Sequence, residues 1–223
     1  MFYKFFRPNE NNVMAVMANA LYAASPLKFN DPLESMCIDQ SIPYMVNQSR
    51  VPHRSETSTR YQTRRFVVCL VRSGENNIDI NDSMLMWAHY ADSHKGFCVE
   101  FGECIKHNLS QSTDYIDDHG IYYESTPPQV FNNAIGYDTE PILTKSRHWE
   151  YEHEYRFVFK KEGLHSLGDK PNDTIRAIYF GVEADMNSSF FRTLIMFAQT
   201  NDIPCFKMER PLSEYKLQFH SIS

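Results

Sequence analysis

The sequence predicts an α+β fold: a single domain over residues 1–223, with split mixed or antiparallel sheets and flanking helices. The 223 residues are 42% hydrophobic and 14% aromatic, which is enough apolar material for one sizeable core. Many apolar runs are short and rich in Phe, Tyr and Val, as strands are. Strands and helices do not alternate regularly, which favours α+β over a doubly wound sheet.

The amino-terminal part begins as strand, helix and strand. Residues 2–6 form a short aromatic run that predicts the first strand. Asn11 and Asn12 offer caps for a helix over residues 13–18, and residues 21–25 predict the second strand before a proline.

The middle of the chain alternates turns with apolar runs. Asn30-Asp31-Pro32 predicts a turn, because Asn and Asp side chains bond to nearby backbone and Pro restricts the backbone after them. The polar residues 39–63 predict a flexible loop or lid. Residues 81–83 can cap a helix over residues 84–91, which we expect to end near a C-cap at Gly96. Further strands are predicted at residues 66–71, 97–101, 155–160, 175–180 and 215–219, and a further helix at residues 190–198.

Charge and cysteine content limit the class of protein. A net charge of -6 is not typical of a nucleic-acid binder, although residues 50–65 concentrate Arg and His and form either a solvated face or a local basic groove. The five cysteines are odd in number and lack CxxC spacing, which predicts free thiols in a reducing compartment. With no apolar leader and no apolar run approaching the ~18 residues of a membrane span, we expect a cytoplasmic protein without a membrane partner.

Three glutamates, Glu150, Glu152 and Glu154, alternate in the run Trp149–Arg156. If this run is extended, its period of two places all three carboxylates on one face, where like charges repel each other. Two interpretations remain open: a solvent-facing edge strand, or a site that stabilises a transient cation on a sugar.

Metal and nucleotide motifs are missing from the sequence. The histidines at 89, 94, 148 and 153 follow no zinc spacing, with neither HExxH nor paired CxxC, so we predict no metal site. There is also no P-loop, no GxGxxG and no GxSxG.

Three motifs carry a family resemblance. They are Phe29–Glu34, Met86–Cys98, and Lys145-Ser146 together with Trp149–Arg156. In this combination the chain resembles the bacterial domain of unknown function 2971 family, up to about residue 160. The family name implies no activity.

The order of parts is also similar to the ADP-ribosyltransferase fold, in which a first strand carries a basic residue and a Glu-x-Glu pair precedes a late strand. The matches would be Lys4 or Tyr3, then Tyr22 or Ser25, then Glu152-His153-Glu154. There are departures: Lys replaces the usual Arg or His, the Ser-Thr-Ser triplet is missing, and Glu150 leaves the register ambiguous.

This resemblance implies a mono-ADP-ribosyltransferase that uses NAD as its substrate. Glu154 would stabilise the oxocarbenium-like state formed when nicotinamide leaves, and Glu152 would orient or deprotonate the acceptor. Cationic side chains would hold the pyrophosphate and an aromatic ring would stack on nicotinamide. The expected NAD-binding residues are Tyr3, Lys4, Arg7, Tyr22, Ser25 and Phe29.

The acceptor would be a macromolecule, with nucleic acid favoured over protein. Such enzymes resemble bacterial toxins or anti-phage defence effectors, for which an antitoxin protein is a further expected partner. Two other classes stay open: a non-catalytic nucleotide- or protein-binding module, and a metal-dependent nuclease that uses the glutamates.

Overall fold

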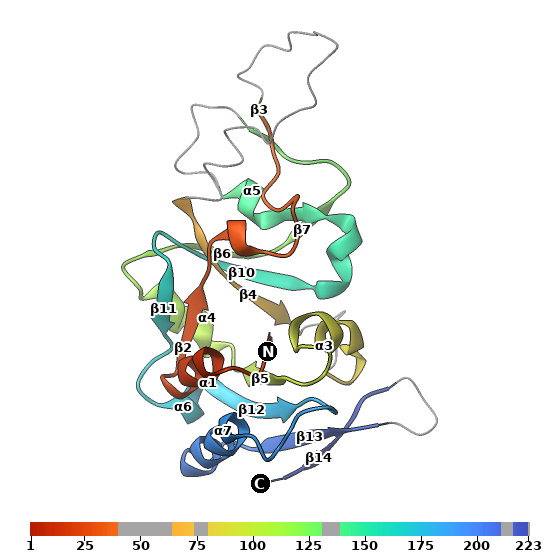
Figure 1. Ribbon diagram of the computed structural model, residues 1–223. Coiled ribbons are helices and arrows are strands. Elements are labelled where there is room, and N and C mark those ends of the chain that lie inside the picture. The colour runs from red at the N-terminus through yellow and green to blue at the C-terminus, as the bar shows by residue number, and fades with distance from the viewer. Residues whose placement is uncertain (40–63, 74–79, 131–138, 211–215, 223) are drawn as a thin grey trace. The chain divides into compact units, whose positions relative to one another are not determined.

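The computed structural model describes residues 1–39, 64–73, 80–130, 139–210 and 216–222 (Figure 1). The lid predicted at 39–63 lies outside the described residues except for its first residue, and so does most of the basic segment 50–65. The backbone divides into two compact units, which we describe separately. Unit 1 comprises Met1–Leu21, Leu70–Ser112 and Leu164–Ser223, and unit 2 comprises Tyr22–Cys69 and Thr113–Gly163. Helices and mixed sheets together confirm the α+β class, while the single domain stays a prediction.

Unit 1 is built on a mixed sheet with the strand order β14-β13-β12-β5-β1-β4. β12 and β13 are parallel, and the β13–β14, β12–β5, β5–β1 and β1–β4 pairs are antiparallel. The strands are β1 (Phe2–Phe6), β4 (Phe66–Arg72, of which residues 70–72 belong to this unit), β5 (Phe97–Phe101), β12 (Ile175–Phe180), β13 (Cys205–Glu209) and β14 (Gln218–Ser221). The helical segments are α1 (Glu10–Met17), η2 (Ile80–Asp82), α3 (Met84–Tyr90), α4 (Cys104–Ser110), α6 (Pro171–Thr174) and α7 (Ser189–Thr200).

The helices of unit 1 start at polar caps. The side chain of Asn9 accepts a hydrogen bond from the backbone N–H of Asn12 at 2.9 Å, so α1 begins earlier than the sequence predicted. Ser188 caps α7 in the same way. The buried residues of α7 recur at helical spacing and face the core of the unit: Phe191, Leu194 and Ala198.

The segment after α3 corrects the prediction for Gly96. The helix ends at Tyr90, and residues 92–94 then follow with positive φ angles of 50°, 54° and 65°. Gly96 is therefore not a C-cap. A Cβ at this position would lie 2.0 Å from the carbonyl oxygen of Phe6, so glycine is required there by the close approach of β1.

Unit 2 has the strand order β4-β10-β6, with β10 and β6 antiparallel. Two short parallel pairs, β3–β8 and β7–β9, complete it. Its elements are η1 (Pro26–Lys28), β3 (Ile38–Asp39), residues 66–69 of β4, β6 (Tyr115–Gly120), β7 (Tyr122–Glu124), β8 (Gln129–Val130), α5 (Glu140–Leu143), β9 (Thr144–Ser146), η4 (Arg147–Glu152) and β10 (Glu154–Phe159). A further pair, β2 (Ala20–Ala23) with β11 (Gly163–Ser166), has residues in both units.

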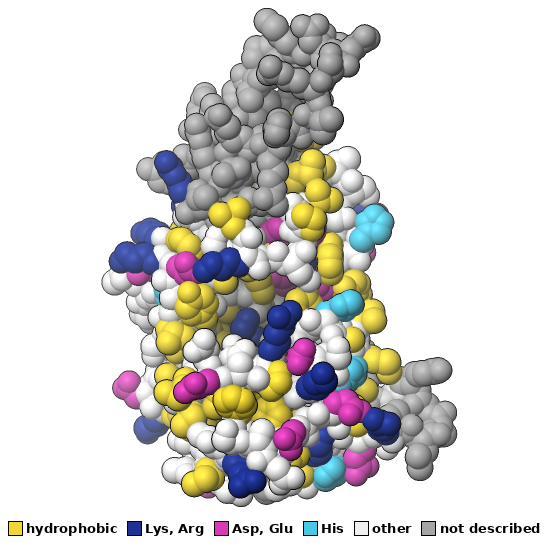
Figure 2. Space-filling view, viewed as in Figure 1, with side chains coloured by type: hydrophobic (Ala, Val, Ile, Leu, Met, Phe, Trp, Pro, Cys, Tyr) yellow, Lys and Arg dark blue, Asp and Glu magenta, His cyan; other side chains and the backbone are white. Residues whose placement is uncertain are grey.

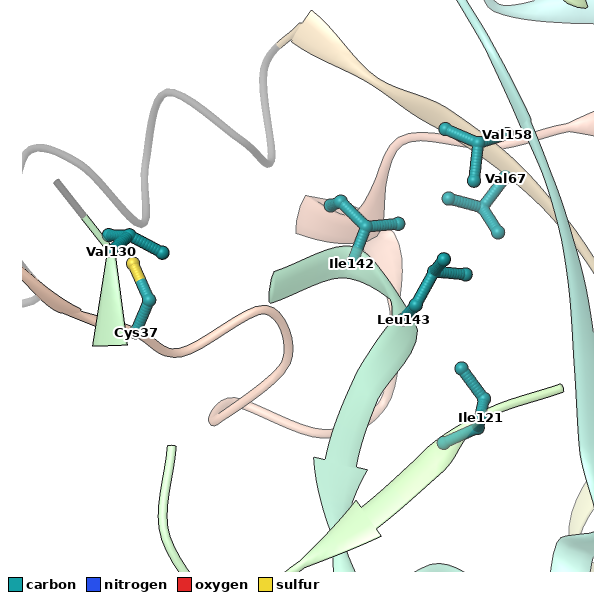
Figure 3. Packing of buried hydrophobic residues seen from close by; sticks show 7 residues of the cluster. All are labelled: Cys37, Val67, Ile121, Val130, Ile142, Leu143 and Val158. Atoms are coloured by element: carbon teal, nitrogen blue, oxygen red, sulfur yellow. The ribbon is translucent and has the colours of Figure 1, made fainter. Parts of the chain in front are cut away.

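The core of unit 2 is a cluster of buried apolar side chains (Figure 3). Cys37 lies beside Val130, because β3 pairs with β8. The other members shown are Val67, Ile121, Ile142, Leu143 and Val158.

All five cysteines of the chain are free thiols, and three of them are buried.

The described surface is mixed in charge. On the face drawn in Figure 2, basic and acidic side chains are interspersed rather than gathered by sign. Among the described residues, no helix combines the length and the apolar character needed to cross a membrane.

Candidate functional site

The glutamate run is not one extended strand, and this overturns the predicted arrangement. Residues 147–152 form the 3₁₀ helix η4, and His153 adopts the left-handed conformation with φ 43° and ψ 46°. Strand β10 begins only at Glu154. Glu150 is exposed, whereas Glu152 and Glu154 are buried. The three carboxylates therefore do not share a face.

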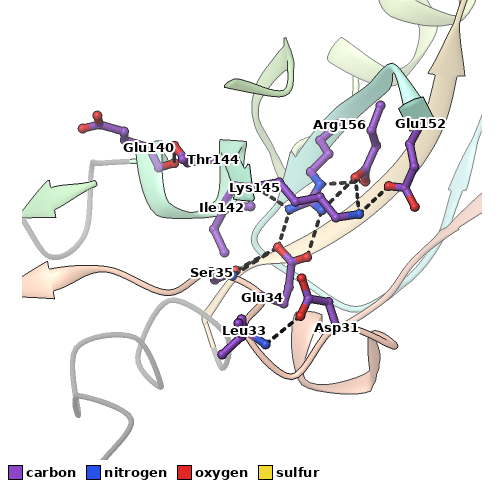
Figure 4. A network of polar contacts seen from close by, with 11 residues as sticks. Asp31, Leu33, Glu34, Ser35, Glu140, Ile142, Thr144, Lys145, Glu152 and Arg156 are labelled. Atoms are coloured by element: carbon purple, nitrogen blue, oxygen red, sulfur yellow. Dashed lines mark hydrogen bonds and ion pairs between the residues drawn. The ribbon is translucent and has the colours of Figure 1, made fainter. Parts of the chain in front are cut away.

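Two cations hold the buried glutamates together instead. The Lys145 ammonium, from β9, donates to Glu152 and, at 3.2 Å, to Glu154 (Figure 4). The Arg156 guanidinium donates to both oxygens of Glu154, at 2.7 and 2.9 Å. It also donates to both oxygens of Glu34, at 2.6 and 3.1 Å. We call Glu34, Lys145, Glu152, Glu154 and Arg156 the charge network; each of these residues is less than a tenth exposed.

Local sequence explains how the network assembles. Glu154 and Arg156 are two residues apart on β10, so their side chains lie on the same face of the strand. Glu34 is positioned by the predicted turn at 30–32. There the Asp31 carboxylate accepts a hydrogen bond from the backbone N–H of Leu33 at 2.8 Å, which bends the chain so that Glu34 points inward.

The network holds Glu154 in its ionised form. Burial by itself raises the pKa of the Glu154 carboxyl, but the neighbouring charges of Arg156 and Lys145 outweigh burial and lower the pKa to about 2. Burial lowers the pKa of Arg156, and the carboxylates of Glu154 and Glu34 raise it well above its usual value. The pKa of Lys145 is also raised, because Glu154 and Glu152 outweigh its burial and the repulsion from Arg156.

Carboxylates outnumber cations within the network. Its five residues contribute three carboxylates and two cations, and Glu34 and Glu152 also interact with groups outside the five. Buried charges act strongly on neighbouring groups because little water screens them. The carboxylates of the network can therefore stabilise a positive charge that comes close to them.

Unit 2 contains two cavities, and network residues line one of them. A cavity of about 220 Å³, which we call the small cavity, is lined by network residues Glu34 and Lys145, by Asp31, and by the hydroxyl side chains of Ser125, Thr126 and Ser146. A second cavity of about 620 Å³ has acidic and aromatic walls formed by Asp117, His119, Tyr122, Glu124 and Glu140. Glu124 and Thr126 line both. Glu152 and Glu154 line neither cavity. Both accept hydrogen bonds from Lys145, which lines the small cavity.

Three of the predicted NAD-binding residues belong to unit 2, and Phe29 is the one that lies against the network. The Arg156 guanidinium is 5.5 Å from the centroid of its ring. Tyr22 is 46% exposed, on β2. Ser25 caps η1 by accepting a hydrogen bond from the N–H of Leu27.

The other three belong to unit 1. Tyr3 is buried in β1 and pairs with Glu100 of β5. The Lys4 ammonium lies 5.7 Å from the ring centroid of Phe6, and Arg7 is exposed. A role for these residues beside Glu154 stays a prediction.

Sequence reasoning gave no catalytic or binding role to four residues that form or border the site: Asp31, Glu34, Lys145 and Arg156. All four stand in the motifs that carried the family resemblance. Arg156, two residues after Glu154, was the available signal, because a cation at that spacing on a strand predicts an ion pair. Among the described residues, no group of three or more His, Cys, Asp or Glu is arranged to hold a metal ion.

Comparison with known proteins supports the predicted family. A family model described as "protein of unknown function (DUF2971)" matches residues 86–157, about a third of the chain, which include most of α3, all of β5 and the start of β10. The match contains two of the three motifs, and Phe29–Glu34 lies outside it. No curated protein matches the chain, and no solved structure does.

Proposed function

We propose that this protein is an NAD-dependent ADP-ribosyltransferase that acts at the small cavity. The proposal comes from the site itself, because the description of the family whose model matches residues 86–157 carries no activity. The single observation that carries the proposal is the buried charge network, which keeps the Glu154 carboxylate ionised and two of whose members line that cavity.

The proposed reaction breaks the bond between nicotinamide and C1′ of the ribose, and the bonding electrons leave with nicotinamide. Positive charge develops on the sugar, a nucleophilic atom of the acceptor bonds to C1′, and the acceptor loses a proton. Fixed negative charge stabilises the cationic transition state more than the substrate. Because the pKa of Glu154 is lowered to about 2, the carboxylate is ionised at every physiological pH.

The roles differ from those that the sequence predicted. Asp31 and Glu34 line the cavity and would face the sugar, whereas Glu154 and Glu152 hold Lys145 and supply charge from behind it. Glu154 is therefore a positioning and electrostatic residue in this proposal. We also propose an ADP-ribosyltransferase-like fold and a cytoplasmic location. The proposed activity does not depend on either.

The acidic surroundings of the cavities bear on the acceptor. The second cavity has Asp117, Glu124 and Glu140 in its walls, and these carboxylates repel a phosphate backbone. We therefore propose a protein acceptor in place of the nucleic acid that the sequence favoured. A bacterial toxin or anti-phage effector, with an antitoxin as partner, is the setting we propose for such an enzyme.

A direct test incubates the protein with NAD labelled on the adenylate, in EDTA, and measures nicotinamide release and label on protein and oligonucleotide acceptors. Glu154→Gln removes one buried negative charge, and we expect release to fall 10²–10³-fold, or about 2.7–4 kcal/mol of barrier, as when one charge-stabilising group is deleted. Glu162→Gln is the matched control, since Glu162 is a partly exposed glutamate of unit 2 paired with Lys28.

Folding is controlled separately, because Glu154→Gln leaves two buried cations with less compensation. Glu154→Asp keeps the charge, and folded fractions of all variants are measured by circular dichroism. Release that varies with the folded fraction alone, or wild-type protein that releases no nicotinamide, would count against the enzyme.

One observation favours a second function, a non-catalytic nucleotide- or protein-binding module. Both oxygens of Glu34 and of Glu154 already accept hydrogen bonds inside the network. A network saturated in this way can serve as a rigid binding wall. Binding of NAD without nicotinamide release identifies this module.

A further inference from the structure

Asp31 of the small cavity has one carboxylate oxygen engaged and one not. Oδ1 accepts the hydrogen bond from Leu33 N–H at 2.8 Å, and among the described residues none donates to Oδ2. Asp31 is 8% exposed and lines the cavity. Oδ2 is not among the buried atoms that lack a partner, so this oxygen is accessible. A ligand in the cavity can therefore supply the donor that the protein does not.

The chemistry of the walls defines that ligand. Hydroxyl groups of Ser125, Thr126 and Ser146 can both donate and accept, which suits a polyhydroxylated ligand. The charged lining residues are three carboxylates and one ammonium, and that ammonium already bonds Glu152 and Glu154. The interior therefore favours a cation and disfavours a phosphate.

Size narrows the choice further. The volume of about 220 Å³ is below the ~300–1,000 Å³ typical of pockets that enclose a whole drug-sized ligand. It therefore suits part of a dinucleotide. The apolar side chains of Leu33, Met36 and Pro127 provide a wall for a flat ring beside the hydroxyl-rich part.

We propose that the small cavity binds the cationic nicotinamide riboside half of the dinucleotide, with a ribose hydroxyl donating to Asp31 Oδ2, and that the phosphates stay outside it. This rests on the proposed function, since it names the part of NAD that the site receives. It assigns substrate contact to Asp31, which comes from the turn at 30–32 and not from the glutamate run.

The test uses isothermal titration calorimetry with nicotinamide riboside and with nicotinamide mononucleotide, which differ by one phosphate. We expect the riboside to bind and the mononucleotide to bind at least tenfold more weakly. Asp31→Asn keeps an oxygen for the turn but replaces the open acceptor by a donor, and should weaken riboside binding at least tenfold with an unchanged thermal midpoint.

Asp185→Asn is the matched control, because Asp185 also accepts a hydrogen bond from the backbone N–H two residues on, but lies in unit 1. We expect wild-type affinity for this variant. No riboside binding, equal binding of the mononucleotide, or unchanged affinity in Asp31→Asn would each overturn the inference.

The two proposals fail in different assays. Riboside binding that depends on Asp31, without nicotinamide release from NAD, keeps the binding site and removes the enzyme. Nicotinamide release that Asp31→Asn leaves unchanged, together with unchanged riboside affinity, keeps the enzyme and removes this site.

Discussion

Arg156→Met tests the charge network directly. The guanidinium is fully buried and donates five hydrogen bonds: two to Glu34, two to Glu154 and one to the carbonyl of Ile142. Methionine fills similar space, so little is lost through packing. Removal of the guanidinium leaves the carboxylates of Glu34 and Glu154 buried without this cation. Breaking a buried ion pair in this way costs about 3–5 kcal/mol. The orphaned Ile142 carbonyl adds about 1 kcal/mol or more.

The assay is urea unfolding followed by circular dichroism. With a slope of about 2 kcal/mol per molar, a loss of about 4 kcal/mol lowers the urea midpoint by about 2 M. Arg210→Met is the matched control, since Arg210 makes an exposed pair with Glu183, and exposed pairs contribute ~0–1 kcal/mol. A midpoint for Arg156→Met as close to wild type as that of the control would refute the buried network.

A double-mutant cycle separates the pair from the rest. Glu34→Gln alone leaves Arg156 with one fewer charged partner, and the double variant removes both charges. Because the two side chains are in direct contact, we expect the double variant to lose less stability than the two single losses together, by about 0.5–3 kcal/mol. Strict additivity would mean that the two residues do not interact.

Three further outcomes are expected from single features. The pKa of Glu154 is lowered from 4.5 to about 2. The ionised carboxylate therefore contributes about 3 kcal/mol to the free energy of unfolding above pH 4.5, and this contribution is lost as the pH falls towards 2. Urea titrations of Glu154→Gln should show a smaller loss of stability than wild type across this pH window. Gly96→Ala places a Cβ 2.0 Å from a carbonyl oxygen and should cost about 1–3 kcal/mol or more, whereas Gly120→Ala, whose nearest neighbour is at 3.9 Å, should change the thermal midpoint little. Asn9→Ala removes the cap of α1 and should cost about 1 kcal/mol in chemical denaturation, while Asn11→Ala, inside the helix, should not destabilise.

The sequence predicted elements well wherever a local pattern decides the structure. The aromatic run of β1 and the apolar runs of β4, β5 and β12 became strands within a residue or two of the predicted bounds. Each of these runs buries most of its side chains, so local propensity and tertiary burial act in the same direction.

The glutamate run failed for an identifiable reason. Alternation in the sequence indicates a strand only if the backbone is extended, and His153 is in the left-handed region instead. That conformation ends η4, so that Glu152 and Glu154 reach Lys145 from two different elements. Neither secondary-structure propensity nor sequence periodicity indicates a left-handed residue at this position. The ion pairs of Glu152 and Glu154 with Lys145 and Arg156 accompany this conformation, and they depend on tertiary structure.

Stability alone does not account for the charge network. Burying ions is expensive, and well-packed apolar residues of similar volume are often neutral or stabilising in their place. This network lies beside a cavity that also contains the open oxygen of Asp31. The charged residues that line the cavity are three carboxylates and one ammonium. These carboxylates would attract a cation into the cavity, and this is why we interpret the network as part of a binding site and not as a structural ion cluster.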